Sequence, residues 1–280
     1  MMKRSFVVGA ASTAIVRSIC LGAAAIAALF SNPASAADLP RKAPQVAAAP
    51  IYNWTGFYIK GGGGYGTWSA DTVTINGDGS CDLCTPTRQG GRGWFGTVGG
   101  GFDVQVSDRW VIGAFADVDF GSIKGNIQDQ DPFSVAEAKL NQAWAVGTRL
   151  GYLITPAVLT YISGGYTQAR FKSGGAILNR GSVLADISYR GFSTSGWFAG
   201  GGFEYNLGWL PGLFWRSEYR LAQYGTKDFL PCNNDGSGCS TVLVANNTTF
   251  HSIRFEPWVQ TIRTELVWRF NWSQPGRGAY

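Results

Sequence analysis

Charged side chains recur at every second position within apolar runs of the sequence, a spacing that could build a buried network of ion pairs. Arg216, Glu218 and Arg220 follow this spacing, and so do Arg263 and Glu265. Side chains two residues apart in a strand share one face. Six bases and six acids are assigned to such faces, so they can neutralise one another: Lys60, Asp103, Asp117, Asp119, Arg149, Glu204, Arg216, Glu218, Arg220, Arg263, Glu265 and Arg269.

Other residues with chemical potential are few. Asp117 and Asp119 could perform general acid–base work, but a place in the ion-pair network is favoured. His251 is the only histidine, so no nucleophile–base pair and no histidine metal site is expected. The run Gly61–Gly66 lacks the Lys-Ser/Thr of a phosphate loop. We therefore predict no catalytic, cofactor-binding or metal-binding residues, and expect that the chain is not an enzyme.

The N-terminus predicts export. Lys3, Arg4 and Arg17 precede an apolar run over 19–30, and Ala-Ser-Ala follows at 34–36. This is the pattern of a secretory signal peptide over 1–36, with cleavage between Ala36 and Ala37. The alternative is an N-terminal anchor helix, for which the run is short. Removal of the signal peptide lowers the formal charge of +5 by three, which leaves no basic stripe of the kind that binds nucleic acid.

Residues 37–53 are rich in proline and alanine and predict a periplasmic linker. A cell-wall contact through Arg41 and Lys42 is the alternative to a plain spacer. No later run reaches the roughly 18 to 20 continuous apolar residues of a membrane helix. If the exported chain enters a membrane, it must do so as a closed barrel, because an open sheet edge would leave backbone groups unpaired in hydrocarbon.

Four cysteines fall in two predicted loops of a chain bound for an oxidising compartment. The local pairs Cys81–Cys84 and Cys232–Cys239 are our first choice, and a pairing that ties the two loops together is the second. A Cys-x-x-Cys spacing also occurs at redox sites, although no βαβ pattern surrounds this one. A four-cysteine zinc site is a further alternative.

Composition and periodicity predict an all-β fold that positions these residues. Glycine is abundant at 39 residues, aromatic residues make up 14% and charged residues 15% of the chain. Such a composition, with period-2 alternation, is typical of many short strands. The predicted strands are 55–68, 93–106, 110–122, 140–154, 158–171, 191–207, 213–225 and 257–272. Short turns at 107–109, 155–157 and 208–212 alternate with long polar loops at 69–92, 123–139, 172–190 and 226–256.

The charges decide which way the barrel faces. A soluble lipocalin-type barrel would keep its apolar residues inside, whereas a membrane barrel places them outside. A charge facing lipid at mid-membrane costs about 2–4 kcal/mol, so a dozen charges on one face must line the lumen. We therefore predict an eight-stranded antiparallel up-and-down transmembrane β-barrel over 54–272, with short periplasmic turns, long extracellular loops and a C-terminal tail over 273–280.

The two ends of the chain are similar to a known family. Ala-Asp-Leu-Pro at 37–40, Trp-Thr-Gly-Phe-Tyr-Ile-Lys-Gly-Gly-Gly-Gly-Tyr-Gly at 54–66 and Ile-Arg-Thr-Glu-Leu-Val-Trp-Arg-Phe-Asn-Trp at 262–272 resemble the RopB-type outer membrane proteins of alphaproteobacteria. The resemblance implies an OmpA-like eight-stranded barrel with exposed loops and a role in envelope integrity or host contact. That family usually has glycine where this chain has Glu265. Trp268 and Phe270 are the predicted assembly signal, although a tail to Tyr280 follows them.

The resulting hypothesis is an integral barrel of the cell outer membrane with a structural or surface-interaction role. The alternative is a porin-like small-solute channel through the charged lumen. Expected partners are outer membrane lipids and lipopolysaccharide, the barrel assembly machinery, and an external ligand or host surface at the long loops. No cofactor and no nucleic acid partner is expected.

Overall fold

The computed structural model describes residues 52–130, 133–178, 184–233, 235–245 and 248–270. Within these ranges the regular structure is an 11-stranded antiparallel sheet. No helix in the described part of the chain is long and apolar enough to cross a membrane. The predicted signal peptide with its cleavage site between Ala36 and Ala37, the linker up to residue 51 and the tail from 271 lie outside the described residues.

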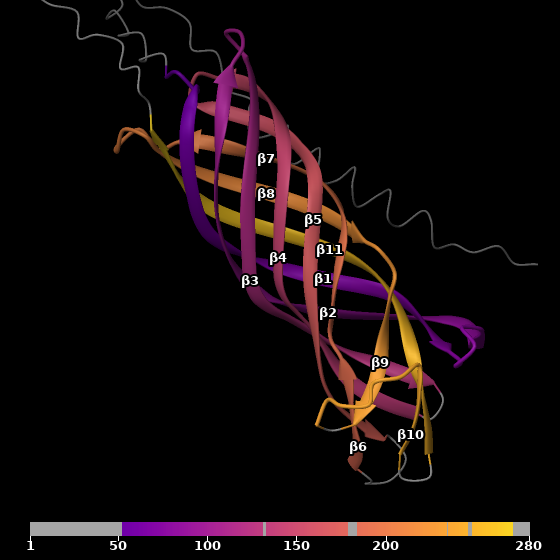
Figure 1. Ribbon diagram of the computed structural model, residues 1–280. Helices are drawn as coiled ribbons and strands as arrows, with labels where there is room; N and C mark the ends of the chain where they lie inside the picture. Colours follow the sequence, from indigo (N-terminus) through magenta and orange to yellow (C-terminus); the bar gives the residue numbers. More distant parts are fainter. Residues whose placement is uncertain (1–51, 131–132, 179–183, 234, 246–247, 271–280) are drawn as a thin grey trace, which may run out of the picture. The chain divides into compact units, whose positions relative to one another are not determined.

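The first six strands pair with one another in chain order as antiparallel neighbours, and the later strands pair out of chain order (Figure 1). The strands are β1 (Gly56–Ile75), β2 (Cys81–Gln105), β3 (Trp110–Gln130), β4 (Phe133–Thr155), β5 (Val158–Leu178), β6 (Leu184–Arg190), β7 (Phe192–Asn206), β8 (Leu213–Tyr224), β9 (Lys227–Asn233), β10 (Val242–Ala245) and β11 (Thr248–Phe270).

The sheet closes into a ring of eight strands along its length. At the end with the short turns, which we call the near half, β5 pairs with β7, β7 with β8, β8 with β11, and β11 closes onto β1. Towards the other end, the far half, β6 and β9 take the places of β7 and β8 between β5 and β11. The strand structure is interrupted at Gly191, between β6 and β7, and at 225–226, between β8 and β9. The predicted eight-stranded up-and-down barrel is thus confirmed.

The predicted long loops are wrong over most of their length, because the strands continue through them. Segments 69–75, 81–92, 123–130, 133–139, 172–178, 184–190, 227–233 and 248–256 are strand. Trp68, Ala70 and Thr72 stay buried on the inner face of β1, while Asp71 is exposed. The sequence is polar there because the outer face lies in water, and composition alone therefore misidentified sheet as loop.

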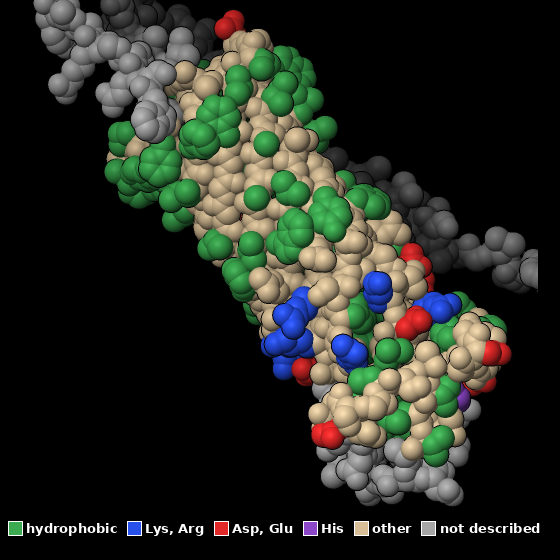
Figure 2. Space-filling model, in the orientation of Figure 1, with side chains coloured by type: hydrophobic (Ala, Val, Ile, Leu, Met, Phe, Trp, Pro, Cys, Tyr) green, Lys and Arg blue, Asp and Glu red, His purple; other side chains and the backbone are tan. Residues whose placement is uncertain are grey.

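An apolar band surrounds the near half on the outside (Figure 2). On β3 it runs from Trp110 to Phe120, and the ten steps between these residues span about 34 Å along a strand and about 24 Å at a tilt of about 45°. This matches the apolar height of about 25 Å in outer membrane barrels. Aromatic residues border both edges: Phe57, Phe102, Trp110, Tyr205, Trp268 and Phe270 form the near girdle, and Trp94, Phe120, Trp144, Tyr166 and Trp197 the far girdle.

Two adjacent glycines of β1 differ in the space beside them. A Cβ on Gly62, two residues after the buried Lys60, would lie 2.1 Å from the carbonyl oxygen of Thr264. A Cβ on the outward Gly61 would find its nearest neighbour, the carbonyl oxygen of Thr97, at 3.8 Å. Of these two glycines, Gly62 is the one whose missing side chain allows β1 and β11 to approach as closely as they do.

We expect Gly62→Ala to lower the free energy of unfolding by about 1–3 kcal/mol, because the backbone of β11 must move away. Gly61→Ala is the matched control, with an expected change below about 0.5 kcal/mol. Urea titration of the refolded barrel, followed by its heat-modifiable mobility in electrophoresis, measures both. Equal stability of the two variants would contradict this account of the β1–β11 contact.

Candidate functional site

The most concentrated chemistry of the molecule lies inside the near half of the barrel. Here Glu204 of β7 is the centre of one group of ion pairs. Its carboxylate accepts hydrogen bonds from Arg149 of β4, Arg216 of β8 and Arg269 of β11, with nitrogen–oxygen distances of 3.2, 2.7 and 2.8 Å. Asp103 of β2 pairs with Arg149 and lies 2.7 Å from Arg269. Two carboxylates and three guanidinium groups thus share one enclosed layer.

A second group lies deeper along the lumen, around Asp117 of β3. Lys60 of β1 and Arg220 of β8 each approach this carboxylate to 2.9 Å. Arg220 also lies 2.8 Å from Glu218. Arg263 of β11 pairs with Asp119 at 3.0 Å, and the Asp119 side chain is 13% exposed. These residues continue the network towards the far half.

Glu265 joins the two groups. Its oxygens lie 3.2 Å from Lys60 and 3.7 Å from Arg216. Because of this link, all twelve charged residues that the sequence places in the lumen belong to one connected network. Position 265, where the resembling family usually has glycine, therefore carries the residue that connects both layers.

Aromatic rings complete the charged layers and were not singled out in the sequence. The ring of Tyr58 faces the guanidinium carbons of Arg149, Arg216 and Arg269 at 4.8, 5.0 and 5.0 Å. Rings at this range attract desolvated cations. The Tyr161 hydroxyl donates to Glu218 at 2.8 Å. The available signal was the alternation itself, since Tyr58 lies two residues before Lys60 and shares its face.

The near end of the lumen is covered by a small aromatic cluster. The rings of Trp54 and Tyr52 each lie 4.9 Å from the ring of Phe214. The backbone carbonyl of Trp54 accepts a hydrogen bond of 3.2 Å from Arg269. The cluster therefore rests directly on the first charged layer and separates it from the near end.

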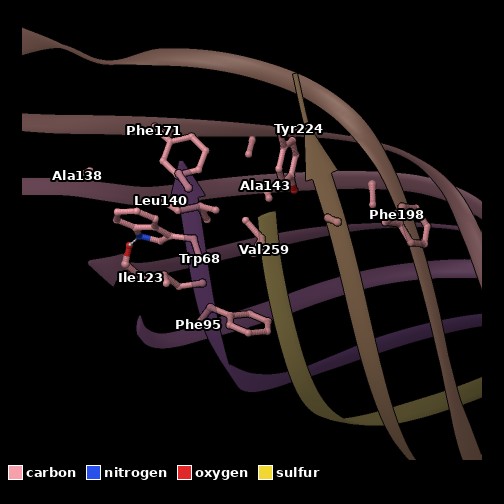
Figure 3. Close-up of a cluster of buried hydrophobic side chains, with 14 of the residues drawn as sticks. Trp68, Phe95, Ile123, Ala138, Leu140, Ala143, Phe171, Phe198, Tyr224 and Val259 are labelled. Carbon is pink, nitrogen blue, oxygen red and sulfur yellow. Dashed lines mark hydrogen bonds between the residues drawn. The ribbon is translucent and has the colours of Figure 1, made fainter. Parts of the chain in front are cut away.

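Beyond the charges the lumen becomes apolar (Figure 3). Trp68 donates a hydrogen bond of 3.2 Å to the carbonyl of Ile123 and packs near Leu140 and Phe171. A cavity of about 20 Å³ lies where Ile123 and Leu140 approach Arg220 and Arg263, which is room for about one water molecule. Further out, Phe255 contacts the rings of Trp68, Phe171, Phe192 and Phe229 at 5.3, 5.3, 6.1 and 5.3 Å.

The structure pairs the four cysteines locally. Cys81 bonds to Cys84 at the start of β2, and Cys232 at the end of β9 bonds to Cys239. Cys81, Cys84 and Cys232 therefore lie in strands rather than in loops. Among the described residues no group of His, Cys, Asp or Glu side chains is arranged to hold a metal ion.

Two turns at the far end share one design. Each contains Asn-x-Asp-Gly-Ser, at 76–80 and at 233–237. The Ser80 backbone N–H donates to Asp78 at 2.9 Å, and that of Ser237 donates to Asp235 at 2.8 Å. The serine hydroxyl and backbone both hydrogen-bond the carboxylate, which lowers the pKa of each aspartate. Gly79 and Gly236 have φ of 82° and 78°, a conformation that favours glycine.

For two further sets of residues from the sequence analysis, the structure gives the position but no function. His251 was expected in a loop, but it lies half-buried in β11. Trp268 and Phe270 lie at the end of β11 with exposed fractions of 37% and 43%, on the outward face. Their role as an assembly signal stays a prediction.

Comparison with known proteins places the whole barrel in a family. The model of the outer membrane protein beta-barrel domain matches residues 23–270. The chain belongs to this outer membrane β-barrel family. The barrel is accordingly an integral protein of the cell outer membrane, and its apolar band is the part that lies in the bilayer.

Relatives of this outer membrane barrel include the 31 kDa outer-membrane immunogenic proteins of Brucella melitensis biotype 1 and Brucella suis biovar 1. Each is 27% identical over 240 residues, which cover 82% of this chain and 95% of the relative. OprG from Pseudomonas aeruginosa is a structural neighbour with 14% identity and a TM-score of 0.48, covering 78% of this chain and 98% of OprG. The protease OmpT from Escherichia coli is another, with 14% identity and a TM-score of 0.39, covering 77% and 97%.

We expect Glu204→Gln to lower the free energy of unfolding of this outer membrane barrel by about 3–5 kcal/mol, because three buried guanidinium groups lose their shared counter-charge. Glu137→Gln is the matched control. Its carboxylate pairs with Lys124 at 3.3 Å, with side chains 47% and 50% exposed, and such surface pairs contribute about 0–1 kcal/mol. Urea unfolding in detergent micelles measures both, and a loss of less than about 1 kcal/mol for Glu204→Gln would refute the central role of this carboxylate.

We expect peptide mapping of the unreduced protein to yield the local cross-links Cys81–Cys84 and Cys232–Cys239. The reduced sample is the control, in which the same peptides gain the mass of two hydrogens per pair. Cross-linked peptides that join residue 81 or 84 to residue 232 or 239, or four free thiols, would contradict the local pairing.

Proposed function

We propose that this protein is a closed outer membrane barrel with a structural and surface-interaction role in the cell envelope, of the RopB type that its two ends resemble. The observation that carries the proposal is the filled lumen. Glu265 connects a continuous set of ion pairs whose side chains are buried across the described near half.

Three layers in series argue against the porin-like alternative. The ring cluster of Trp54 and Phe214 covers the near end, the ion pairs occupy the middle, and the side chains around Trp68 and Phe171 fill the lumen beyond. An ion that crossed the middle layer would have to separate buried partners, and each broken buried pair costs about 3–5 kcal/mol. An eight-stranded barrel is also narrow enough for side chains to fill.

The far half is the part offered to the outside of the cell. It is built as sheet, so its outward polar side chains are held on a rigid wall around an apolar core. Two relatives are named as immunogenic outer-membrane proteins, which supports a barrel with some surface open to the outside. We infer that an external ligand or host surface is contacted here, and that the membrane half serves as anchor.

We infer no catalytic activity. Each lumen carboxylate of the described network has a basic partner within 4.0 Å, and the sequence contains one histidine. The likeness in architecture to a protease does not supply a nucleophile or a general base. Asp117 and Asp119, which could have formed an acid–base pair, are engaged by Arg220 and Arg263.

We expect the refolded protein, shown to be inserted in a planar bilayer, to give no steady conductance, because the lumen is filled along the membrane half. The measurement needs no second, open barrel as a reference, because the expected result is the absence of a steady current. Protein that has been heat-unfolded before addition controls for leakage that does not depend on the folded barrel.

A steady, ion-selective conductance that changes in Arg263→Ala or Glu218→Ala would overturn the proposal, because it would show that ions pass these side chains. A barrel that stays silent in the wild type and in both variants would support closure by several layers rather than by one residue.

A further inference from the structure

Four basic side chains form a row across the outer surface, just beyond the far girdle. Arg92 of β2 lies directly opposite Lys124 of β3, Lys124 opposite Lys139 of β4, and Lys139 opposite Lys172 of β5. We call these residues the basic row. Neighbouring strands are about 4.8 Å apart, so the row extends over about 15 Å.

The side chains of the basic row point away from the barrel. Arg92, Lys124 and Lys172 are exposed and Lys139 is half-buried. Their neighbours along the strands are buried and face the lumen, as Ile123, Ala138, Leu140 and Phe171 show. Figure 2 shows Lys and Arg side chains gathered beyond the edge of the apolar band.

The basic row destabilises the sheet unless anions neutralise its charges. Like charges directly opposite one another on neighbouring strands destabilise a sheet, and here three such pairs occur in succession. Within the described part of the chain, the row makes one ion pair, between Lys124 and the exposed Glu137 at 3.3 Å. Three of its positive charges therefore have no ion-pair partner among the described residues.

The position of the row identifies the kind of anion. Arg92 lies two residues beyond Trp94 of the far girdle, and Lys172 lies six residues beyond Tyr166. These separations are about 7 Å and about 20 Å along the strands, and the tilt of the strands reduces their height above the band. Arg170, exposed on the same face of β5, fills the space between Tyr166 and Lys172. The row thus stands at the level of lipid headgroups rather than of hydrocarbon.

The unbroken series of directly opposed basic residues is confined to β2 to β5, although Arg190 of β6 and Lys227 of β9 are also exposed. On the side of β1 and β11, the outward residues beyond the band include Asp71 and Glu256, which lie opposite each other. Arg88 of β2 lies opposite Asp71 and has a counter-charge on its own sheet. The strands β2 to β5 therefore carry the directly opposed basic residues, while β1 and β11 carry an acidic pair.

We propose that the basic row binds the phosphate groups of an anionic glycolipid in the outer leaflet of the membrane. Several cations in a line, beside an aromatic girdle, fit a lipid headgroup that carries more than one phosphate and whose acyl chains lie against the apolar band. Basic residues near a membrane surface contribute about 1 kcal/mol each to binding of anionic lipid. The proposal rests on the outward orientation of the far half in the proposed function.

The test is retention of bisphosphorylated lipid A by the full-length protein in a non-ionic detergent, measured by native mass spectrometry. The variant Lys139→Gln/Lys172→Gln removes two adjacent members of the row that have no carboxylate partner among the described residues. We expect its apparent dissociation constant to rise about 25-fold. Arg88→Gln/Arg109→Gln removes the same charge outside the row, and we expect a change below about twofold.

Two further probes separate a lipid headgroup from other anions. Lipid A stripped of its phosphates should bind the wild type about as weakly as bisphosphorylated lipid A binds the row variant. Inorganic phosphate in millimolar excess, or a sulfated glycan, should not displace the bound lipid. Heat-modifiable electrophoretic mobility confirms that each variant is folded.

The proposal is overturned if the row variant retains lipid A as tightly as the control variant, if phosphate-free lipid binds equally well, or if inorganic phosphate or the glycan displaces the lipid. Binding in detergent does not depend on conductance. Its failure would therefore leave the closed lumen untouched, and a conducting lumen would leave the row intact.

Discussion

The structure depends on one constraint: charged groups that cannot face hydrocarbon must share a narrow lumen in which each finds a partner. Burial of an unpaired ion costs several kcal/mol, so the number and sign of the inward charges are coupled across strands. Glu204 meets this demand for three arginines at once, and Glu265 does so for two layers. Small inward residues follow from the same need for space, as at Gly101, where a Cβ would lie 2.5 Å from the Tyr58 hydroxyl.

The inner face of the barrel changes from charged to apolar along the length of the barrel, and the outer face changes from apolar to polar. On β11, the buried residues near its end are Arg269, Glu265 and Arg263, whereas earlier in the same strand they are Val259, Phe255 and Ile253. The outward residues change in the opposite sense, from Trp268 and Leu266 to Gln260 and Glu256. Where lipid surrounds the barrel, the outer face must be apolar and the charged residues must face the lumen. Where water surrounds it, the outer face can be polar and the inner face apolar. One continuous strand therefore fits both surroundings, because its polar and apolar faces change places along its length.

This reversal explains how far the sequence could be interpreted. Where lipid surrounds the barrel, alternation identified the strands and the inward charges from Lys60 to Arg269. Beyond the membrane, the polar outer face and small inner residues such as Thr72 and Ala138 resemble loop composition, and the strands there were missed. The sequence also could not predict which acidic residue pairs with which basic residue, because the stagger between the strands decides this. Arg220 and Asp117, for example, lie 103 positions apart in the chain.

The extension of the wall beyond the bilayer limits how the exposed part of this protein can diverge. In a flexible loop every residue is free to change, but in a closed sheet only alternate residues contact the surroundings, while their neighbours pack on Phe255 and the rings around it. A surface such as Asp71 with Arg88 and Glu256 is assembled from three strands. An antibody or a phage that binds it recognises a folded, discontinuous epitope, and escape by substitution is confined to every second position.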